Sequence, residues 1–337
     1  MGEETKPRKR KKLTVDDYVN GVLNQDRAMI ARAITLVESN SPKHFDMAQE
    51  LLRRLMPYTG KSIRIGFTGV PGAGKSTLIE AFGTMLCEQD HRVAVLAVDP
   101  SSAISRGSIL GDKTRMEKLS RHPNAYVRPS PSGGSLGGVA RKSRETMLIC
   151  EAAGYDVIIV ETVGVGQNEI TVRSMVDFFL VIMLTGAGDE LQGMKKGIME
   201  IADAIFINKA DGDNVQKARA AKAEFNRLLH YLKPASPGWK TKAYTVSALT
   251  GDGVPTIWEV IKDYERKMKE SGYFEENRAN QLSEWMDRLI EDELKMSFYE
   301  HQQIKKTLPE MKKKVTTGEI PLAQAVQELM KVYRKEK

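Results

Sequence analysis

The 337 residues suffice for one large domain with additions, and 41% hydrophobic and 28% charged residues are ordinary proportions for a globular protein. No apolar run approaches the ~20 residues that cross a bilayer, and the basic start of the chain lacks a signal-peptide core, so we expect neither a membrane-spanning nor a secreted protein. The net charge of +7 is concentrated in residues 6–12, which predicts a disordered basic tail over residues 1–13 and does not favour nucleic acid as a partner.

The two cysteines, Cys87 and Cys150, lie far apart in separate apolar stretches. This predicts buried thiols in a cytoplasmic protein rather than a disulfide framework.

Residues 14–61 are predicted to form a helical N-terminal extension. Apolar side chains recur at helical spacing in three successive stretches, of which the third begins at Ser41-Pro42 and stops at Pro57.

Residues 62–272 alternate between apolar runs and helical patterns. The runs are mostly continuous rather than alternating, which is typical of parallel strands covered on both faces. We therefore predict an α/β domain with a doubly wound, mostly parallel sheet and ligands at the carboxyl ends of its strands. The predicted strands are 63–68, 93–98, 126–128, 156–161, 178–184, 204–208 and 243–247.

Residues 273–337 are predicted to be a helical C-terminal arm. One helix carries the apolar residues from Leu282 to Leu294, a second ends near Thr307 ahead of Pro309, and a third begins near Pro321. The broad apolar faces leave two interpretations open, namely helices packed on the same domain and an arm for oligomerisation.

The stretch from Gly69 to Ser76 has the phosphate-binding pattern G-x-x-x-x-G-K-[ST], between a predicted strand and a predicted helix. This context predicts a P-loop NTPase. The loop and the first helical turn would turn backbone N–H groups toward an anion. Lys75 would reach the β- and γ-phosphates, and the Ser76 hydroxyl would bind Mg²⁺. The residues expected at the phosphates are Gly69, Pro71, Gly72, Ala73, Gly74, Lys75, Ser76 and Thr77.

Asn208-Lys209-Ala210-Asp211 follows a predicted strand and has the N-K-x-D pattern of GTPases. A carboxylate at Asp211 can accept hydrogen bonds from the ring N–H and the exocyclic amine of guanine, whereas adenine offers neither on that edge. Ser247-Ala248-Leu249 after the next strand is similar to a base-contacting element. The sequence therefore predicts GTP and GDP as ligands.

Glu161 ends a predicted strand where small GTPases carry the aspartate of D-x-x-G, with Gly164 available to the γ-phosphate. Asp99 and Asp112 are further candidates for the Mg²⁺ shell or for orienting water. Because Mg²⁺ usually keeps several waters, Asp99, Asp112 and Glu161 need not all bind it directly.

The water-positioning glutamine that follows D-x-x-G in Ras-like enzymes is replaced by Val165, and Gln167 is displaced. Slow intrinsic hydrolysis that depends on a partner is therefore predicted. The loop of residues 185–196 places acidic, amide and basic side chains between glycines. It is either a mobile switch or an ordinary turn.

The combination of G-V-P-G-A-G-K-S, V-D-P-S-S, V-E-T-V-G-V-G-Q, G-A-G-D-E-L-Q-G and N-K-A-D resembles the MeaB/ArgK family over residues 62–268. The family consists of GTPase chaperones of methylmalonyl-CoA mutase, in the signal-recognition-particle-like division of P-loop GTPases. The resemblance implies a homodimer through the C-terminal arm and a prokaryotic, cytoplasmic member, because no organellar presequence is evident.

The resemblance further implies an adenosylcobalamin-dependent acyl-CoA mutase as partner. GTP binding and hydrolysis would gate cofactor loading and protect or reactivate the mutase. The third switch of the family matches Asp189 to Lys195, so Gln192 and Lys195 become candidate triggers of hydrolysis. Lys75, Asp99, Asp112 and Glu161 complete the expected catalytic set.

Two other classes remain open. A nickel-insertion metallochaperone GTPase shares the glutamate at the Glu161 position but usually carries Cys/His clusters, and the five histidines here are scattered. A P-loop kinase or ATPase linked to amino-acid transport is the other, although N-K-A-D argues against ATP as the preferred substrate.

Overall fold

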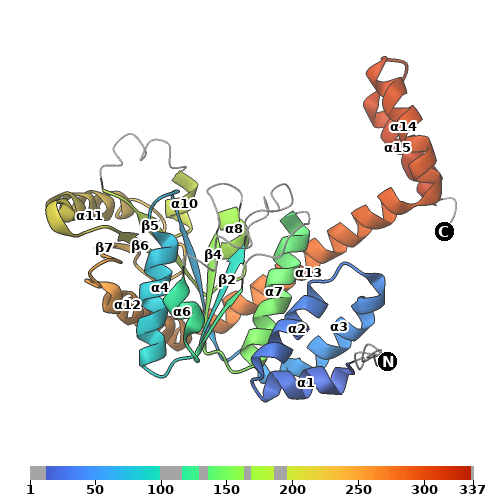
Figure 1. The fold of residues 1–337 in the computed structure, drawn as a ribbon. Coiled ribbons are helices and arrows are strands. Elements are labelled where there is room, and N and C mark those ends of the chain that lie inside the picture. The colour runs from blue at the N-terminus through green and yellow to red at the C-terminus, as the bar shows by residue number, and fades with distance from the viewer. Residues whose placement is uncertain (1–12, 99–115, 129–135, 163–167, 186–195, 335–337) are drawn as a thin grey trace, which may run out of the picture. The chain divides into compact units, whose positions relative to one another are not determined.

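The computed structural model describes residues 13–98, 116–128, 136–162, 168–185 and 196–334. It divides into two compact units, the first ending at Arg278 and the second beginning at Ala279. In the described residues the first unit combines a sheet with helices, and the second contains helices alone (Figure 1). None of the described helices has the length and apolar character that a bilayer crossing needs.

In the described part of the first unit, seven parallel strands form one sheet in the order β3-β2-β4-β1-β5-β6-β7. The doubly wound α/β fold is thus confirmed, and each predicted strand is present with ends that differ by at most two residues. The central strands are buried along almost their whole length, which explains their continuous apolar runs. The strands are β1 (Ile63–Gly69), β2 (Val93–Val98), β3 (Ala125–Arg128), β4 (Val157–Thr162), β5 (Phe178–Met183), β6 (Ala204–Ile207) and β7 (Lys242–Thr245).

Helices cover both faces of the sheet (Figure 1). Alternate residues of a strand pack into different cores: Val93 and Val95 of β2 join one, and Ala94 and Leu96 join the other. The first core includes α4 (Lys75–Glu88), α6 (Glu117–Arg121) and α12 (Val254–Glu270). The second includes α7 (Leu136–Ala152), α8 (Asn168–Arg173), α10 (Lys196–Glu200) and α11 (Val215–Leu229). A short 3₁₀ turn, η3 (Gly212–Asn214), precedes α11. Cys87 and Cys150 are buried free thiols, as predicted.

Three N-terminal helices share the core of α7. The Thr14 side chain and the Asp17 side chain bond each other's backbone N–H groups in a capping box, which fixes the start of the first helix. Asp26 caps the second helix through the N–H groups of Ala28 and Met29. The elements are α1 (Val15–Leu23), α2 (Arg27–Val37), α3 (Pro42–Leu55) and the 3₁₀ turn η1 (Met56–Tyr58).

An aspartate lies immediately before each of β4, β5 and β6. Each carboxylate accepts a hydrogen bond from a backbone N–H of a neighbouring strand or of the residue that leads into it, so each ties the start of one strand to another. The bonds are Arg92 N–H to Asp156 at 2.7 Å, Arg64 N–H to Asp177 at 2.8 Å, and Phe179 N–H to Asp203 at 2.8 Å.

Strand β7 forms one edge of the sheet. The Asn226 side chain of α11 donates to the carbonyl oxygen of Ala243 at 3.3 Å and accepts from its N–H at 3.0 Å. Both backbone groups of Ala243 therefore bond a side chain in place of a further strand.

The second unit begins within α13 (Tyr273–Glu300) and continues with α14 (Gln302–Thr316) and α15 (Leu322–Arg334). Ile304 and Met311 of α14 pack with Ala325 and Leu329 of α15. The prediction that a helix ends before Pro309 is wrong, since α14 runs through it. The buried side chains on both sides of the proline hold the helix together even though the proline cannot donate its backbone hydrogen bond.

One stripe of α13 carries large apolar side chains at four-residue spacing, each half or more exposed in the single chain. They are Leu282, Met286, Ile290 and Leu294.

Candidate nucleotide site

The loop between β1 and α4 depends on its glycines. Gly69 has φ +153°, and a Cβ there would lie 2.3 Å from the carbonyl oxygen of Ile182 on β5. Gly74, in the left-handed region at φ +82°, immediately precedes α4. Only glycine adopts these conformations without strain at such close approach. The loop therefore leads directly into the free N–H groups at the start of α4, which is the geometry of an anion site.

Two side chains at the start of α4 point back toward this loop. The Lys75 ammonium donates to the carbonyl oxygens of Gly69 at 2.8 Å and Val70 at 3.3 Å. The Ser76 hydroxyl donates to Glu161 Oε1 at 3.0 Å. Glu161 lies near the end of β4 and is only 6% exposed, so the strand order brings this carboxylate beside the loop.

The Ser76 and Glu161 oxygens fit a magnesium ion. Mg²⁺ requires octahedral oxygen ligands at about 2.1 Å, so two adjacent ligands lie about 3.0 Å apart. The distance between these two oxygens is 3.0 Å. A hydroxyl and a buried carboxylate beside a phosphate loop also form the donor set that this hard ion prefers.

Asn208 connects the phosphate loop to the second loop of the site. It follows β6 and is 1% exposed. Its amide donates to the carbonyl oxygen of Ala73 at 2.8 Å, and its Oδ1 accepts from the N–H of Ala248 at 3.1 Å. One side chain thus holds together two segments that are 175 residues apart in the sequence.

Asp211 lies at the end of the same turn, with one carboxylate oxygen bonded by the hydroxyl of Ser247. Ser247 is fully buried, and the N–H of Thr250 donates to its Oγ at 3.1 Å. Asp211 is therefore oriented by a rigid neighbour while it stays partly accessible. Lys209 is exposed with φ +59°, and Leu249 is 83% exposed at the tip of the adjoining loop.

The remaining predicted residues fall into two groups. Pro71, Gly72 and Thr77 are exposed around the phosphate loop. The others lie outside the described residues, so the structure gives no position for Asp99, Asp112, Gly164, Val165, Gln167, Asp189, Gln192 and Lys195.

The sequence patterns missed two features of the site. The Thr185 hydroxyl at the end of β5 donates to Asn214 Oδ1 at 2.7 Å, and Asn214 in turn donates to the carbonyl of Lys209 at 2.7 Å. This links Thr185, at the end of the described residues 168–185, to the turn that contains Lys209. Asn214 lies three residues after Asp211, where a polar side chain before a helix is itself a capping signal.

The second feature is a cavity of about 250 Å³ beside the loop after β7, with Ser247 and Asp252 in its wall. It lies against the edge strand β7. No sequence motif marks it, because its lining comes from four separate segments. These are Ala210, Lys222, residues 244–247 and the group Asp252, Gly253 and Thr256.

Comparison with known proteins agrees with this geometry. Residues 30–303 match the family described as "Methylmalonyl Co-A mutase-associated GTPase MeaB". The chain is 48% identical to the GTPase ArgK of Escherichia coli, over 83% of this chain and 85% of that protein. It is 44% identical to the mitochondrial methylmalonic aciduria type A homolog of Mus musculus, over 95% of this chain and 80% of that protein. The solved structure of an LAO/AO transport system kinase is similar, with a TM-score of 0.77 and 36% identity over 95% of this chain and 97% of that one.

Proposed function

The chain belongs to the MeaB family of methylmalonyl-CoA mutase-associated GTPases, and from this premise we propose that it hydrolyses GTP as the chaperone of an adenosylcobalamin-dependent acyl-CoA mutase. The observation that carries the nucleotide part is the bridge made by Asn208. It joins the phosphate loop at Ala73 to the base loop at Ala248, so phosphates and base would be held by one rigid unit.

The phosphates would bind at the loop between β1 and α4. A phosphate oxygen is a stronger acceptor for an ammonium group than a neutral carbonyl oxygen. Lys75 would therefore leave the carbonyl groups of Gly69 and Val70 for the β- and γ-phosphates. The phosphates would lie against the backbone of Pro71, Gly72 and Gly74, and Thr77 lies in the first turn of α4.

Ser76 and Glu161 would hold Mg²⁺, and Asp99 and Asp112 are proposed for its water shell. The ion would neutralise charge on the β- and γ-phosphate oxygens. The backbone N–H of Gly164 is proposed to bond the γ-phosphate.

Guanine specificity is proposed to depend on Asp211. Two hydrogen bonds from guanine to a carboxylate contribute about 1.5–3 kcal/mol each. Asp211→Asn should therefore weaken GDP binding by roughly a hundredfold or more. The same substitution should favour a xanthine nucleotide, because xanthine carries a carbonyl where guanine carries the amine.

Calorimetry with GDP, ADP and xanthosine diphosphate tests this specificity. Asp213→Asn, two residues further on and exposed, is the matched control and should bind GDP as the wild type does. Equal affinity of the wild type for GDP and ADP would remove guanine specificity. It would favour the transport-linked kinase or ATPase, which the name of the solved relative suggests.

We propose slow intrinsic hydrolysis, because Val165 stands where a water-positioning glutamine is found in Ras-like enzymes. The mutase would accelerate turnover through Asp189, Gln192 and Lys195. The test is GTP turnover with and without purified methylmalonyl-CoA mutase. Undiminished stimulation in both Gln192→Ala and Lys195→Ala would remove this segment as the trigger.

A homodimer through residues 279–337 is part of the proposal. The apolar stripe on α13 supports it, because four large side chains half or more exposed on one stripe are typical of an interface. A chain that ends after Arg278 should be monomeric by light scattering, and Met286→Asp should weaken the dimer in the full-length protein. A truncated chain that stays dimeric would place the interface elsewhere.

A further inference from the structure

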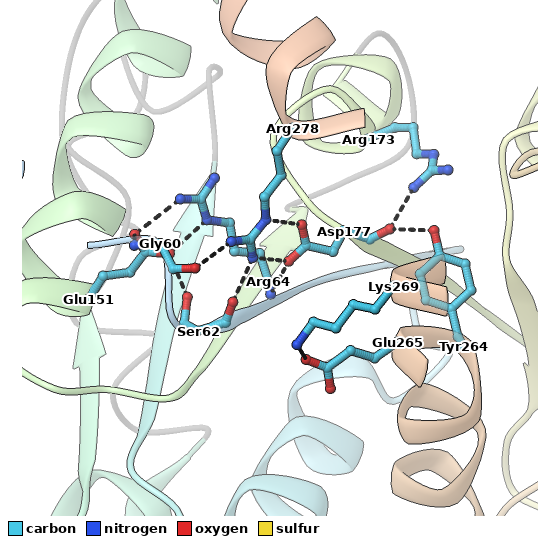
Figure 2. Close-up of polar contacts among 10 residues, drawn as sticks. All are labelled: Gly60, Ser62, Arg64, Glu151, Arg173, Asp177, Tyr264, Glu265, Lys269 and Arg278. Atoms are coloured by element: carbon cyan, nitrogen blue, oxygen red, sulfur yellow. Dashed lines mark hydrogen bonds and ion pairs between the residues drawn. The ribbon is translucent and has the colours of Figure 1, made fainter. Parts of the chain in front are cut away.

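A network of charged side chains around two buried carboxylates lies near the amino ends of β1 and β5 (Figure 2). These ends are opposite to the nucleotide site, because the phosphate loop follows the carboxyl end of β1. We call this set of side chains the amino-end network, and it consists of Glu151, Arg64, Asp177 and Arg278. The Arg64 guanidinium contacts Glu151 with two nitrogens, at 2.9 and 3.0 Å. The backbone N–H of Arg64 donates to Asp177 at 2.8 Å, so one residue of β1 joins both carboxylates.

Arg278 completes the network from α13. Its Nε and Nη2 each lie 2.7 Å from a different oxygen of Asp177, a two-pronged contact that fixes the plane of the guanidinium. Its Nη1 and Nη2 also donate to the carbonyl oxygens of Gly60 at 2.7 Å and Ser62 at 2.6 Å. The Phe274 ring lies 4.5 Å from the guanidinium carbon. Arg278 is the last residue of the first unit, and the rest of α13, from Ala279, belongs to the second.

Asp177 occupies a special place in the chain. It follows α8, which comes directly after residues 163–167, and it precedes β5, which leads to residues 186–195. The first segment contains Gly164, for which the sequence predicts a contact with the γ-phosphate, and the second contains the residues that the family resemblance identifies as a switch. The backbone carbonyl of Asp177 accepts from Arg173 of α8 at 3.2 Å and from the Tyr264 hydroxyl at 3.0 Å (Figure 2). A displacement of α8 or β5 along its axis would therefore act on the residue that holds Arg278.

We propose that Asp177 and Arg278 are positioning residues through which the nucleotide site and residues 279–337 act on each other. The bound nucleotide would set the position of α8 and β5. Because Asp177 lies between them and binds Arg278, a shift of either element would move the first turns of α13. The inference rests on the proposed function, because it requires that GTP and GDP bind and that the two segments distinguish them.

The geometry favours transmission through this contact. From Arg64 to Gly69, β1 spans roughly 17 Å of rigid strand. The same strand therefore leads into the phosphate loop at one end and carries at the other end the Arg64 N–H that donates to Asp177. The end of α8 is held as well, because Arg144 donates to the carbonyl of Ser174. A partly buried guanidinium with four hydrogen bonds has few intermediate positions, so the contact suits an element with two discrete arrangements.

Thermodynamic linkage makes the proposal reciprocal. If the nucleotide changes the affinity of residues 279–337 for a partner, then that partner must change the relative affinity for GTP and GDP by the same factor. The mutase or a second copy of the chain could thus alter nucleotide preference without touching the nucleotide.

The test is hydrogen–deuterium exchange of the full-length protein with GDP and with a non-hydrolysable GTP analogue. In the wild type, exchange in residues 273–285 should differ between the two nucleotides by about fivefold or more, the lower range of allosteric coupling. Arg278→Met, which keeps the aliphatic length but removes the donors, should abolish this difference. Arg288→Met is the matched control, since Arg288 is an exposed arginine on the same helix, and it should keep the difference.

Calorimetry on the same variants gives the second readout. In Arg278→Met the ratio of the affinities for the analogue and for GDP should shift by about fivefold or more. In Arg288→Met this ratio should stay unchanged. If Arg278→Met does not fold, Arg278→Lys keeps the charge but cannot make the two-pronged contact, and should reduce the difference.

The outcomes separate the inference from the proposed function. A wild type that binds both nucleotides without any difference in exchange overturns the inference alone, as does an Arg278→Met or Arg278→Lys protein with an undiminished difference. A wild type that binds neither nucleotide overturns the proposed function and the inference together.

Discussion

The bridge made by Asn208 gives a prediction whose magnitude follows from the structure. Asn208→Ala removes the hydrogen bonds to Ala73 and Ala248. Ala73 is fully buried, so its carbonyl oxygen loses its partner without gaining water, at a cost of about 1–3 kcal/mol. Ala248 is only partly buried, so its N–H can be hydrated and its lost bond costs about 1 kcal/mol. The free energy of unfolding should fall by about 2–4 kcal/mol.

For a unit of this size the fall corresponds to a decrease in the melting temperature of about 4–16 °C, at roughly 2–4 °C per kcal/mol. Because the bridge joins the two halves of the nucleotide site, GDP affinity should also fall about tenfold or more. Thermal unfolding and GDP calorimetry on the same preparations measure the two effects.

Asn226→Ala is the matched control for this variant. Asn226 also bonds both backbone groups of a buried alanine, Ala243, but not at the phosphate loop. It should lose stability and keep its GDP affinity. If Asn208→Ala and Asn226→Ala both lost stability and both kept full GDP affinity, the reasoning that one side chain aligns the two loops would be refuted.

Three further predictions concern the phosphate loop and the amino-end network. Gly74→Ala should weaken GDP binding in calorimetry by about tenfold or more, because its φ is +82° and the new Cβ would lie 2.7 Å from the Asn208 amide nitrogen. Ser76→Ala removes the hydroxyl 3.0 Å from Glu161, so Mg²⁺ should no longer tighten nucleotide binding in a titration with and without the ion. Burial raises the pKa of Glu151, but its partner Arg64 and the hydrogen bonds from Ser62 and Gly60 outweigh this and hold the pKa below the ordinary value of 4.5. The stability that the ionised Glu151 contributes is therefore complete above pH 4.5 and is lost as the pH falls through the lowered pKa. In urea unfolding, the difference in unfolding free energy between the wild type and Glu151→Gln should therefore be smaller at about pH 3 than at about pH 7.

The fold was predictable because its strands are buried on both faces. Every residue of β5 from Phe178 to Met183 is apolar and buried, and such a continuous apolar run is typical of a parallel strand covered on both faces. The phosphate loop was predictable because its sequence pattern requires glycine at Gly69 and Gly74, where the backbone has positive φ and close neighbours. Local patterns of this kind are visible in one sequence.

The parts that were not predictable depend on partners far away in the chain. Arg278 reads as one more charge on a helix, and its acceptors lie 101 residues away at Asp177 and 218 residues away at Gly60. The predicted helix end before Pro309 was wrong for the same reason, because burial of Met311 against another helix outweighs the local effect of proline. The aspartates before β4, β5 and β6 are an intermediate case. An acidic residue directly before an apolar run is visible in the sequence, but its bond to the neighbouring strand is not.

The amide of Asn226 has a consequence for association. An extended peptide that added itself to the β7 edge would need the N–H and C=O of Ala243, and both are already bonded. Growth of the sheet by strand addition is thereby obstructed at its β7 end, which protects against edge-to-edge aggregation when the local concentration is high.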